Sequence, residues 1–109
     1  MTDTGHRPLW YDMHMESWRR QCIAVDKNTK EKFQLSFIIH QPTQYEVNFG
    51  CVCEITGAPD LRTEIYGLDA IQAIELGIRF LQSEFESLSK TFDFYYITGE
   101  KMMSFTSPA

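Results

Sequence analysis

Hydrophobic side chains recur with helical spacing in the second half of this 109-residue chain. Intervals of three and four residues place side chains on one stripe of an α-helix. The residues at these intervals are Ile71, Ile74, Ile78, Leu81, Phe85 and Leu88. Small residues beside the stripe would let the helix backbone approach the layer that it covers, and these are Ala70, Ala73 and Gly77. The pattern predicts that residues 61–89 form a strand, a tight glycine turn and one long helix.

Polar residues mark the start and the outer side of this helix. Asp69 is a favourable N-cap, and Gln72 follows three residues later, as in a capping box. Gly67 allows the tight turn that precedes the cap. The outer arc carries Gln72, Glu75, Arg79, Gln82 and Glu86. A helix with one apolar face needs a second layer to cover that face, so the rest of the chain should supply a sheet.

Alternation of apolar and polar residues predicts strands in the rest of the chain. The predicted strands span residues 16–25, 32–40, 45–56, 61–66 and 91–98. Residues 45–56 give the clearest pattern, and the positions expected to face the core are Tyr45, Val47, Phe49, Cys51, Cys53 and Ile55. Turn-forming residues separate the first four strands, at 26–29, 41–44 and 57–60.

These elements predict a two-layer α+β fold. The short turns favour an antiparallel β-meander of about five strands, and the helix would pack on its apolar face. The predicted order is four strands, the helix and a last strand (ββββαβ), in a single domain that spans residues 1–109. Near the N-terminus, Leu9, Trp10 and Tyr11 form an apolar knot that we expect to pack on the sheet edge.

The face of the sheet opposite the helix is predicted to be open and polar. Its outward-facing side chains should include Glu46, Asn48, Glu54, Arg62 and Glu64. Antiparallel pairing should bring Glu54 close to the fourth strand. We interpret these residues as a candidate partner-binding surface, while noting that any solvated sheet face is polar.

Charge is distributed unevenly along the chain. The net charge is −5, and residues 41–69 hold one basic and five acidic side chains. An acidic surface disfavours direct binding to nucleic acid, which requires a basic footprint. It is compatible with a basic protein partner. A requirement for solubility alone would also explain the acidic balance.

The sequence contains no arrangement of side chains that points to catalysis. Cys51 and Cys53 could join a metal site, but they share a predicted core face with Phe49 and Ile55, so we interpret them as small core residues. The histidines are scattered, at His6, His14 and His40. We therefore predict no enzymatic activity, no metal and no cofactor.

Several features of the sequence favour a cytoplasmic protein. The first residues, MTDTGHRPLWYDM, contain no apolar run, so we expect no signal peptide. No window approaches the apolar length that spans a membrane, so we expect no membrane partner. Three cysteines, without a disulfide-like framework, fit a reducing compartment.

The segment YGLDAIQAIEL, residues Tyr66 to Leu76, resembles a motif in a family of small bacterial domains of unknown function. In those domains strands precede a helix that opens with G-x-D-x-x-Q-A. Some similar small acidic proteins act as immunity proteins, which neutralise the toxins of bacterial competition systems. The resemblance implies a toxin-binding role and supplies no catalytic residues.

Two functional hypotheses follow. The first is an immunity protein that binds a cognate toxin, a basic effector such as a nuclease, through an acidic surface. The alternative is a small-ligand-binding or enzymatic α+β domain with a pocket between helix and sheet. A titratable cluster inside the helix–sheet layer would favour the alternative. The sequence leaves the identity of the partner and the formation of a homodimer open.

Overall fold

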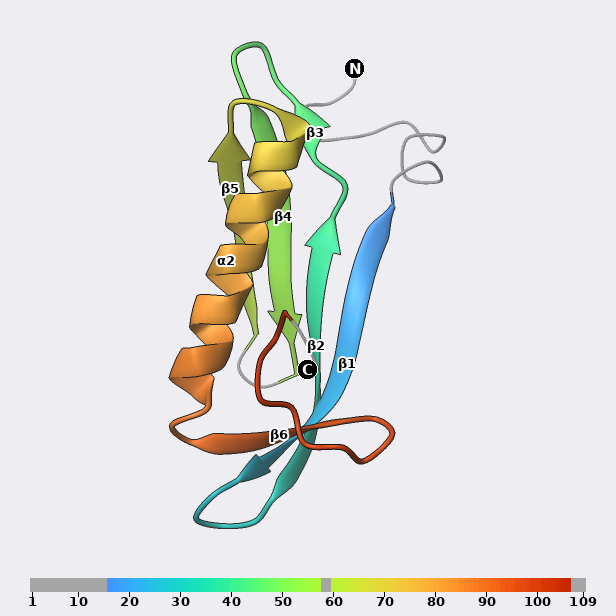
Figure 1. Ribbon diagram of the computed structural model, residues 1–109, viewed down its shortest axis with the longest axis vertical. Coiled ribbons are helices and arrows are strands. Elements are labelled where there is room, and N and C mark those ends of the chain that lie inside the picture. The colour runs from blue at the N-terminus through green and yellow to red at the C-terminus, as the bar shows by residue number, and fades with distance from the viewer. Residues whose placement is uncertain (1–15, 58–59, 107–109) are drawn as a thin grey trace, which may run out of the picture.

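A computed structural model describes residues 16–57 and 60–106, which form a six-stranded antiparallel sheet and one long helix (Figure 1). The elements are β1 (Ser17–Asp26), β2 (Lys32–His40), β3 (Thr43–Gln44), β4 (Phe49–Thr56), β5 (Leu61–Gly67), α2 (Ala70–Leu88) and β6 (Phe92–Tyr96). The predicted α+β architecture, with its ββββαβ order, is confirmed. The short strand β3 is an addition to that order.

Strand β4 is the centre of the pairing scheme. β5 pairs along one edge of β4. Because that edge is occupied, β2 and the short β3 share the other edge. β1 pairs with β2, and β6 adds to the outer edge of β1. The chain therefore crosses from one edge of the sheet to the other through α2, which covers one face (Figure 1).

Helix α2 approaches β4 through small residues. Its buried positions are Ala73, Gly77, Leu81 and Phe85. A Cβ atom at Gly77 would lie 2.8 Å from the Cys53 Sγ atom, so the predicted role of the small residues is confirmed for Ala73 and Gly77, whereas Ala70 is only half-buried. The predicted apolar stripe is wrong at Ile71, which is 71% exposed. At 3.6 residues per turn, Ile71 lies roughly 100° from the centre of the buried arc.

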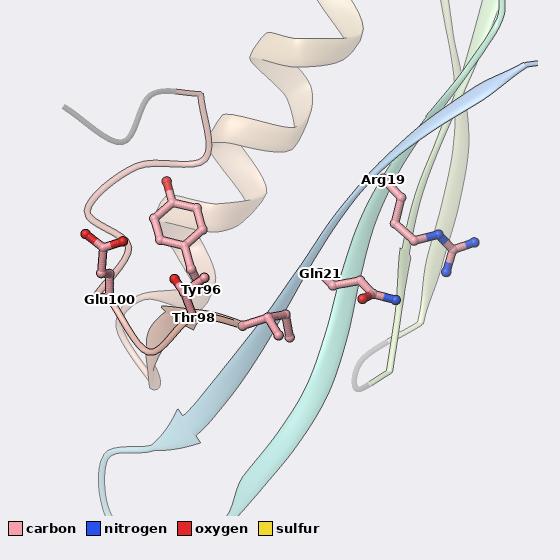
Figure 2. A pocket seen from close by; sticks show the side chains of 6 residues that line it. Arg19, Gln21, Tyr96, Thr98 and Glu100 are labelled. Carbon is pink, nitrogen blue, oxygen red and sulfur yellow. The ribbon is translucent and has the colours of Figure 1, made fainter.

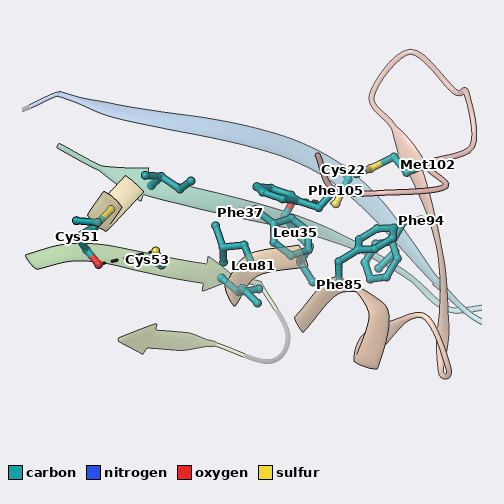
Figure 3. Packing of buried hydrophobic residues seen from close by; sticks show 14 residues of the cluster. Cys22, Leu35, Phe37, Cys51, Cys53, Leu81, Phe85, Phe94, Met102 and Phe105 are labelled. Atoms are coloured by element: carbon teal, nitrogen blue, oxygen red, sulfur yellow. Dashed lines mark hydrogen bonds between the residues drawn. The ribbon is translucent and has the colours of Figure 1, made fainter. Parts of the chain in front are cut away.

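The hydrophobic core fills the layer between α2 and the sheet (Figure 3). Its largest fully buried side chains are Phe37, Phe94, Leu35, Ile55, Leu81, Cys22, Cys51 and Cys53. All three cysteines are free thiols. The interpretation of the cysteines as small core residues is therefore confirmed.

The segment after β6 completes this core beside the helix. Met102 and Phe105 are buried, and the ring centroids of Phe105 and Phe37 are 5.1 Å apart (Figure 3). Gln82 of α2 fixes the segment, because its Oε1 atom accepts hydrogen bonds from the Phe105 N–H at 2.8 Å and the Ser104 hydroxyl at 3.1 Å. The prediction that Gln82 belongs to a purely outer arc is therefore wrong.

The G-x-D-x-x-Q-A motif forms the turn and cap that start α2. The Asp69 carboxylate accepts the Gln72 N–H at 2.8 Å, and the Gln72 Oε1 atom accepts the Leu68 N–H at 2.6 Å. At Gly67 a Cβ atom would lie 2.5 Å from the Ala73 backbone nitrogen. The predicted N-cap is confirmed, and each fixed position of the motif has a structural role.

Strand β4 begins at Phe49 rather than at Tyr45. Residues 45–48 form the turn between β3 and β4, in which the Tyr45 N–H donates to the Asn48 carbonyl at 2.8 Å. Tyr45 is 44% exposed and Val47 is 81% exposed, so the prediction that both face the core is wrong. The reason is that β3 pairs antiparallel with β4, which requires the chain to reverse here.

Some predictions concern residues outside the described ranges. They include the apolar knot of Leu9, Trp10 and Tyr11 and the placement of His6 and His14. Among the residues that the structure does describe, no helix has the length and apolar character needed to cross a membrane.

Candidate interaction surface

The face of the sheet opposite α2 carries a group of charged residues from three strands. The register of β4 and β5 pairs Glu54 with Arg62. The Glu54 Oε2 atom lies 3.1 Å from an Arg62 guanidinium nitrogen and is hydrogen-bonded to the His40 ring. The Glu54 side chain is only 18% exposed. Its charge is therefore compensated within the domain.

A second group lies on the same face, nearer the β3–β4 turn. Glu64 accepts hydrogen bonds from the Tyr45 hydroxyl at 2.6 Å and from the Tyr66 hydroxyl at 3.1 Å. The bond to Glu64 raises the pKa of Tyr66, because the carboxylate favours the protonated phenol. The Glu64 carboxylate lies over Gly50, where a Cβ atom would collide with it.

The structure brings together only some of the predicted partner-binding residues. Glu54, Arg62 and Glu64 lie on the open face, as predicted, and Glu54 contacts the neighbouring strand. Glu46 and Asn48 do not lie on a strand, because the chain reverses between β3 and β4. Glu46 is exposed in this turn, whereas Asn48 is half-buried.

Large apolar side chains are exposed where the β3–β4 turn, the end of β5 and the start of α2 meet, at the upper end of the view in Figure 1. The exposed fractions are 44% for Tyr45, 81% for Val47, 52% for Tyr66, 79% for Leu68 and 71% for Ile71. The ring centroids of the two tyrosines are 6.3 Å apart. We call these five residues the apolar end. Gathered exposed apolar side chains are typical of interaction sites.

The apolar end has an acidic setting. The segments that build it, residues 43–50 and 64–73, contain Glu46, Glu64 and Asp69 but no lysine or arginine. Arg62, further along β5, is paired with Glu54. An apolar surface with an acidic rim is complementary to a partner that presents apolar residues beside lysine or arginine.

Periodicity does not identify the apolar end. Val47 continues the alternation of a strand, and Ile71 continues the spacing of a helix stripe, so both resemble core residues in the sequence. Leu68 precedes the N-cap, where a hydrophobic staple would pack it against Ala73. In the structure Leu68 is 79% exposed, so its place before the N-cap does not make it a buried residue. The sequence feature that does mark the apolar end is the concentration of acidic residues in the segments that build it, residues 43–50 and 64–73.

A groove of about 270 Å³ lies between α2 and strands β1 and β2. The residues that line it are Trp18, Arg19, Arg20, Phe37, Ile39, Ile78, Phe105 and Thr106. The Arg20 guanidinium lies over the Phe105 ring, 5.7 Å from its centroid, and donates to the Phe105 carbonyl. This described lining includes no carboxylate, histidine or thiol, so it lacks the titratable cluster that would favour an enzymatic pocket.

The cysteine thiols lie away from solvent. Cys22, Cys51 and Cys53 are each fully buried. Burial raises the pKa of Cys22 to about 11, and a hydrogen bond with Cys51 together with burial raises the pKa of Cys53. Cys22 and Cys53 are therefore buried neutral thiols, which are poor nucleophiles. The hydrogen bond with Cys53 lowers the pKa of Cys51, but the Cys51 side chain is fully buried. Within residues 16–57 and 60–106, no group of three or more His, Cys, Asp or Glu side chains is placed to hold a metal ion.

Comparison of the chain with protein-family models, with curated proteins and with solved structures gave no match in any of the three. The resemblance of residues 66–76 to small bacterial domains therefore stays a prediction, as does the immunity role that it implies.

Proposed function

We propose that this domain is a binding protein that recognises a basic protein partner through the apolar end. The observation that carries the proposal is the exposure of five large apolar side chains beside Glu46, Glu64 and Asp69. Buried apolar area favours association by roughly 25 cal/mol per Å² before its costs are subtracted. Tyrosines are frequent anchors of interfaces, and Tyr45 and Tyr66 would serve as such here.

The acidic rim would act mainly on the rate of association. Carboxylates around an interface steer a cationic partner towards it, and salt weakens this effect. Glu54 is compensated by Arg62, so Glu46 and Glu64 would contribute more of this steering. The proposed surface therefore keeps two of the residues predicted from the sequence and adds the apolar end to them.

In its narrower form, the proposal is a cytoplasmic immunity protein that neutralises a bacterial toxin. Two features support it: the resemblance at the start of α2 and the net charge of −5. A nuclease holds its substrate with a basic surface, since nucleic-acid affinity depends on phosphate contacts. An acidic domain bound over that surface would inhibit the toxin by occlusion, which requires no catalytic residue and no cofactor.

Capture of the partner from the source cell with matched variants tests the proposal. Val47→Asp places a charge in the apolar end, and Met103→Asp places the same charge at an equally open site, 76% exposed, after β6. A partner should be retained by wild type and Met103→Asp and lost by Val47→Asp. Equal retention by both variants would contradict the proposed surface. The more specific proposal of an immunity protein is tested by a separate measurement. Stoichiometric binding of this domain should abolish the toxic activity of the captured partner.

Small-ligand binding remains a second candidate, because the groove between α2 and β1 has the apolar lining typical of ligand sites. Trp18 lies at this groove and is 52% exposed, so an occupant would change its fluorescence. A Trp10→Phe variant isolates that signal, and a further Ile78→Phe substitution would fill the groove without adding a second tryptophan. A small molecule that changes Trp18 emission in the first variant, but not after the groove is filled, would favour this candidate.

A further inference from the structure

Half of strand β1 has an outer edge to which none of the described strands is paired. β1 pairs with β2 along most of its length, whereas β6 covers only Cys22–Asp26 on the other side. After the pair Cys22 and Tyr96, the chain turns away, and the Gly99 N–H donates to the Tyr96 carbonyl at 2.8 Å. Within the part of the chain that the structure describes, no strand pairs with the outer edge of residues 17–21.

The hydrogen bonds at the other end of β1 fix which backbone groups point outward. The Asp26 N–H donates to the Glu31 carbonyl, on the β2 side, and the Lys27 N–H donates to the Thr91 carbonyl, on the β6 side. Successive residues of a strand direct their backbone groups to opposite edges. The odd-numbered residues therefore direct N–H and C=O groups to the unpaired edge, and these are Ser17, Arg19 and Gln21.

Two concavities border this edge. On the α2 side, the groove of about 270 Å³ is lined by Trp18 and Arg20 of β1. Along the edge, a wider concavity of about 680 Å³ lies between Arg19 and Gln21 and the turn after β6. Figure 2 shows Arg19 and Gln21 pointing to one side of β1, with Tyr96 on the other. Space for side chains is therefore available on both sides of the unpaired edge.

The same segment carries two arginines that form no ion pair with the described residues. Arg19 is exposed, and Arg20 is half-buried. The described Arg and Lys ion pairs lie elsewhere, such as Lys101 with Asp93 at 3.6 Å. Guanidinium groups bind carboxylates in strong, directional hydrogen bonds. The Glu100 carboxylate lines the wider concavity on the other side of β1, whereas both guanidinium groups belong to the edge strand itself, so the charge of this edge is complementary to an acidic ligand.

We propose that the edge at residues 17–21 binds an extended acidic segment of a partner protein by strand addition. Backbone pairing would supply part of the affinity, and alternate side chains would supply specificity. Apolar side chains of the added strand would enter the groove beside Trp18, and carboxylates would lie on the open face beside Arg19. This site shares no residue with the apolar end, so it is independent of the proposed function.

Amide hydrogen exchange of the 109-residue chain, followed by NMR, tests the proposal with a defined probe. The probe is a short capped peptide in which glutamate and valine alternate. In the free protein, the Arg19 and Gln21 N–H groups should exchange faster than those of Arg20 and Cys22, which point towards β2. Saturation with the probe should slow exchange at Arg19 and Gln21 by about tenfold or more.

Two substitutions separate backbone pairing from charge. Arg19→Pro removes one outward N–H group and leaves the β1–β2 bonds intact, since proline is tolerated where the N–H faces an open edge. Arg19→Gln removes only the charge. We expect Arg19→Gln to weaken probe binding about tenfold and Arg19→Pro to abolish it. A lysine–valine peptide should bind wild type less tightly than the probe.

Three results would overturn the proposal. Protection of the Arg19 and Gln21 N–H groups in the free chain would mean that the chain itself covers the edge. Unchanged exchange at the highest soluble probe concentration would mean that the arginines only guard the edge against association. Equal binding by wild type and Arg19→Pro would place the probe elsewhere.

Discussion

At the scale of single residues, Gly77 determines how closely α2 approaches the sheet. A Cβ atom there would lie 2.8 Å from the Cys53 Sγ atom and 3.4 Å from the Cys51 Sγ atom. Both thiols are fully buried, and closely packed interiors leave little room for displacement. The glycine on the helix and the small thiol side chains on β4 therefore form one packing unit.

Gly77→Ala should destabilise the protein by about 1–3 kcal/mol through overpacking. This expectation holds although alanine is favoured over glycine inside a helix by about 1 kcal/mol. In a Cys53→Ala background, which makes room for the new methyl group, the same substitution should be neutral or stabilising. Denaturation of wild type, both single variants and the double variant measures the coupling. If Gly77→Ala changes the free energy of unfolding equally in both backgrounds, Gly77 does not pack directly against the Cys53 thiol.

The buried thiol of Cys22 connects stability to alkaline pH. Burial raises its pKa from the ordinary 9.0 to about 11, so the folded state holds this proton more tightly than the unfolded state. The resulting stability is complete below about pH 9 and is lost as the pH rises towards 11. Over that range, the free energy of unfolding should fall more steeply for wild type than for Cys22→Ala. Parallel pH curves would show that the Cys22 thiol is accessible in solution.

At the scale of elements, the segment after β6 acts as part of the contact between α2 and the sheet. Gln82→Ala would leave the Phe105 N–H without its acceptor, which should cost about 1–3 kcal/mol and speed hydrogen exchange at that amide. The matched control is Ser83→Ala, at an exposed neighbouring position, which should change stability by less than about 0.5 kcal/mol. Similar losses in both variants would mean that Gln82 does not fix this segment.

Element boundaries are predictable from sequence where local side-chain chemistry sets them. The Asp26 carboxylate accepts the Asn28 and Thr29 N–H groups at 2.7 and 2.9 Å, so the β1–β2 turn is encoded locally. The β3–β4 turn has no such signal, because Glu46 and Val47 continue the alternation of the strand. The reversal there depends on pairing between β3 and β4, which periodicity does not contain.

The candidate site, like the element boundaries, is predictable from sequence only in part. Strand parity correctly places Glu54, Arg62 and Glu64 on one face. The contacts of Glu54 with His40 and Arg62 depend on the register of three strands, which no local pattern fixes. The exposure of the apolar end depends on where β5, α2 and the β3–β4 turn finish relative to one another. This is a property of the assembled fold.

At the scale of the whole molecule, acidic residues and exposed apolar side chains lie together at one end. The β3–β4 turn and the start of α2 lie at this end, and the β1–β2 turn lies at the other (Figure 1). Among the predicted site residues, Glu46 is exposed at the turn, whereas Glu54 is held by Arg62. A cationic partner should therefore be steered towards the apolar end, in an orientation that brings its apolar residues against Val47 and Leu68.

Association with such a partner should depend on Glu46 and Glu64. Glu46→Lys combined with Glu64→Gln should slow association about tenfold at low salt, and the difference should shrink at moderate salt as screening increases. Glu31→Lys combined with Glu86→Gln makes the same change in net charge, in the β1–β2 turn and near the end of α2. Association rates of the captured partner with wild type and both double variants, measured at two salt concentrations, separate local steering from overall charge. If both double variants slow association equally, net charge explains the effect, and the apolar end is not the docking surface.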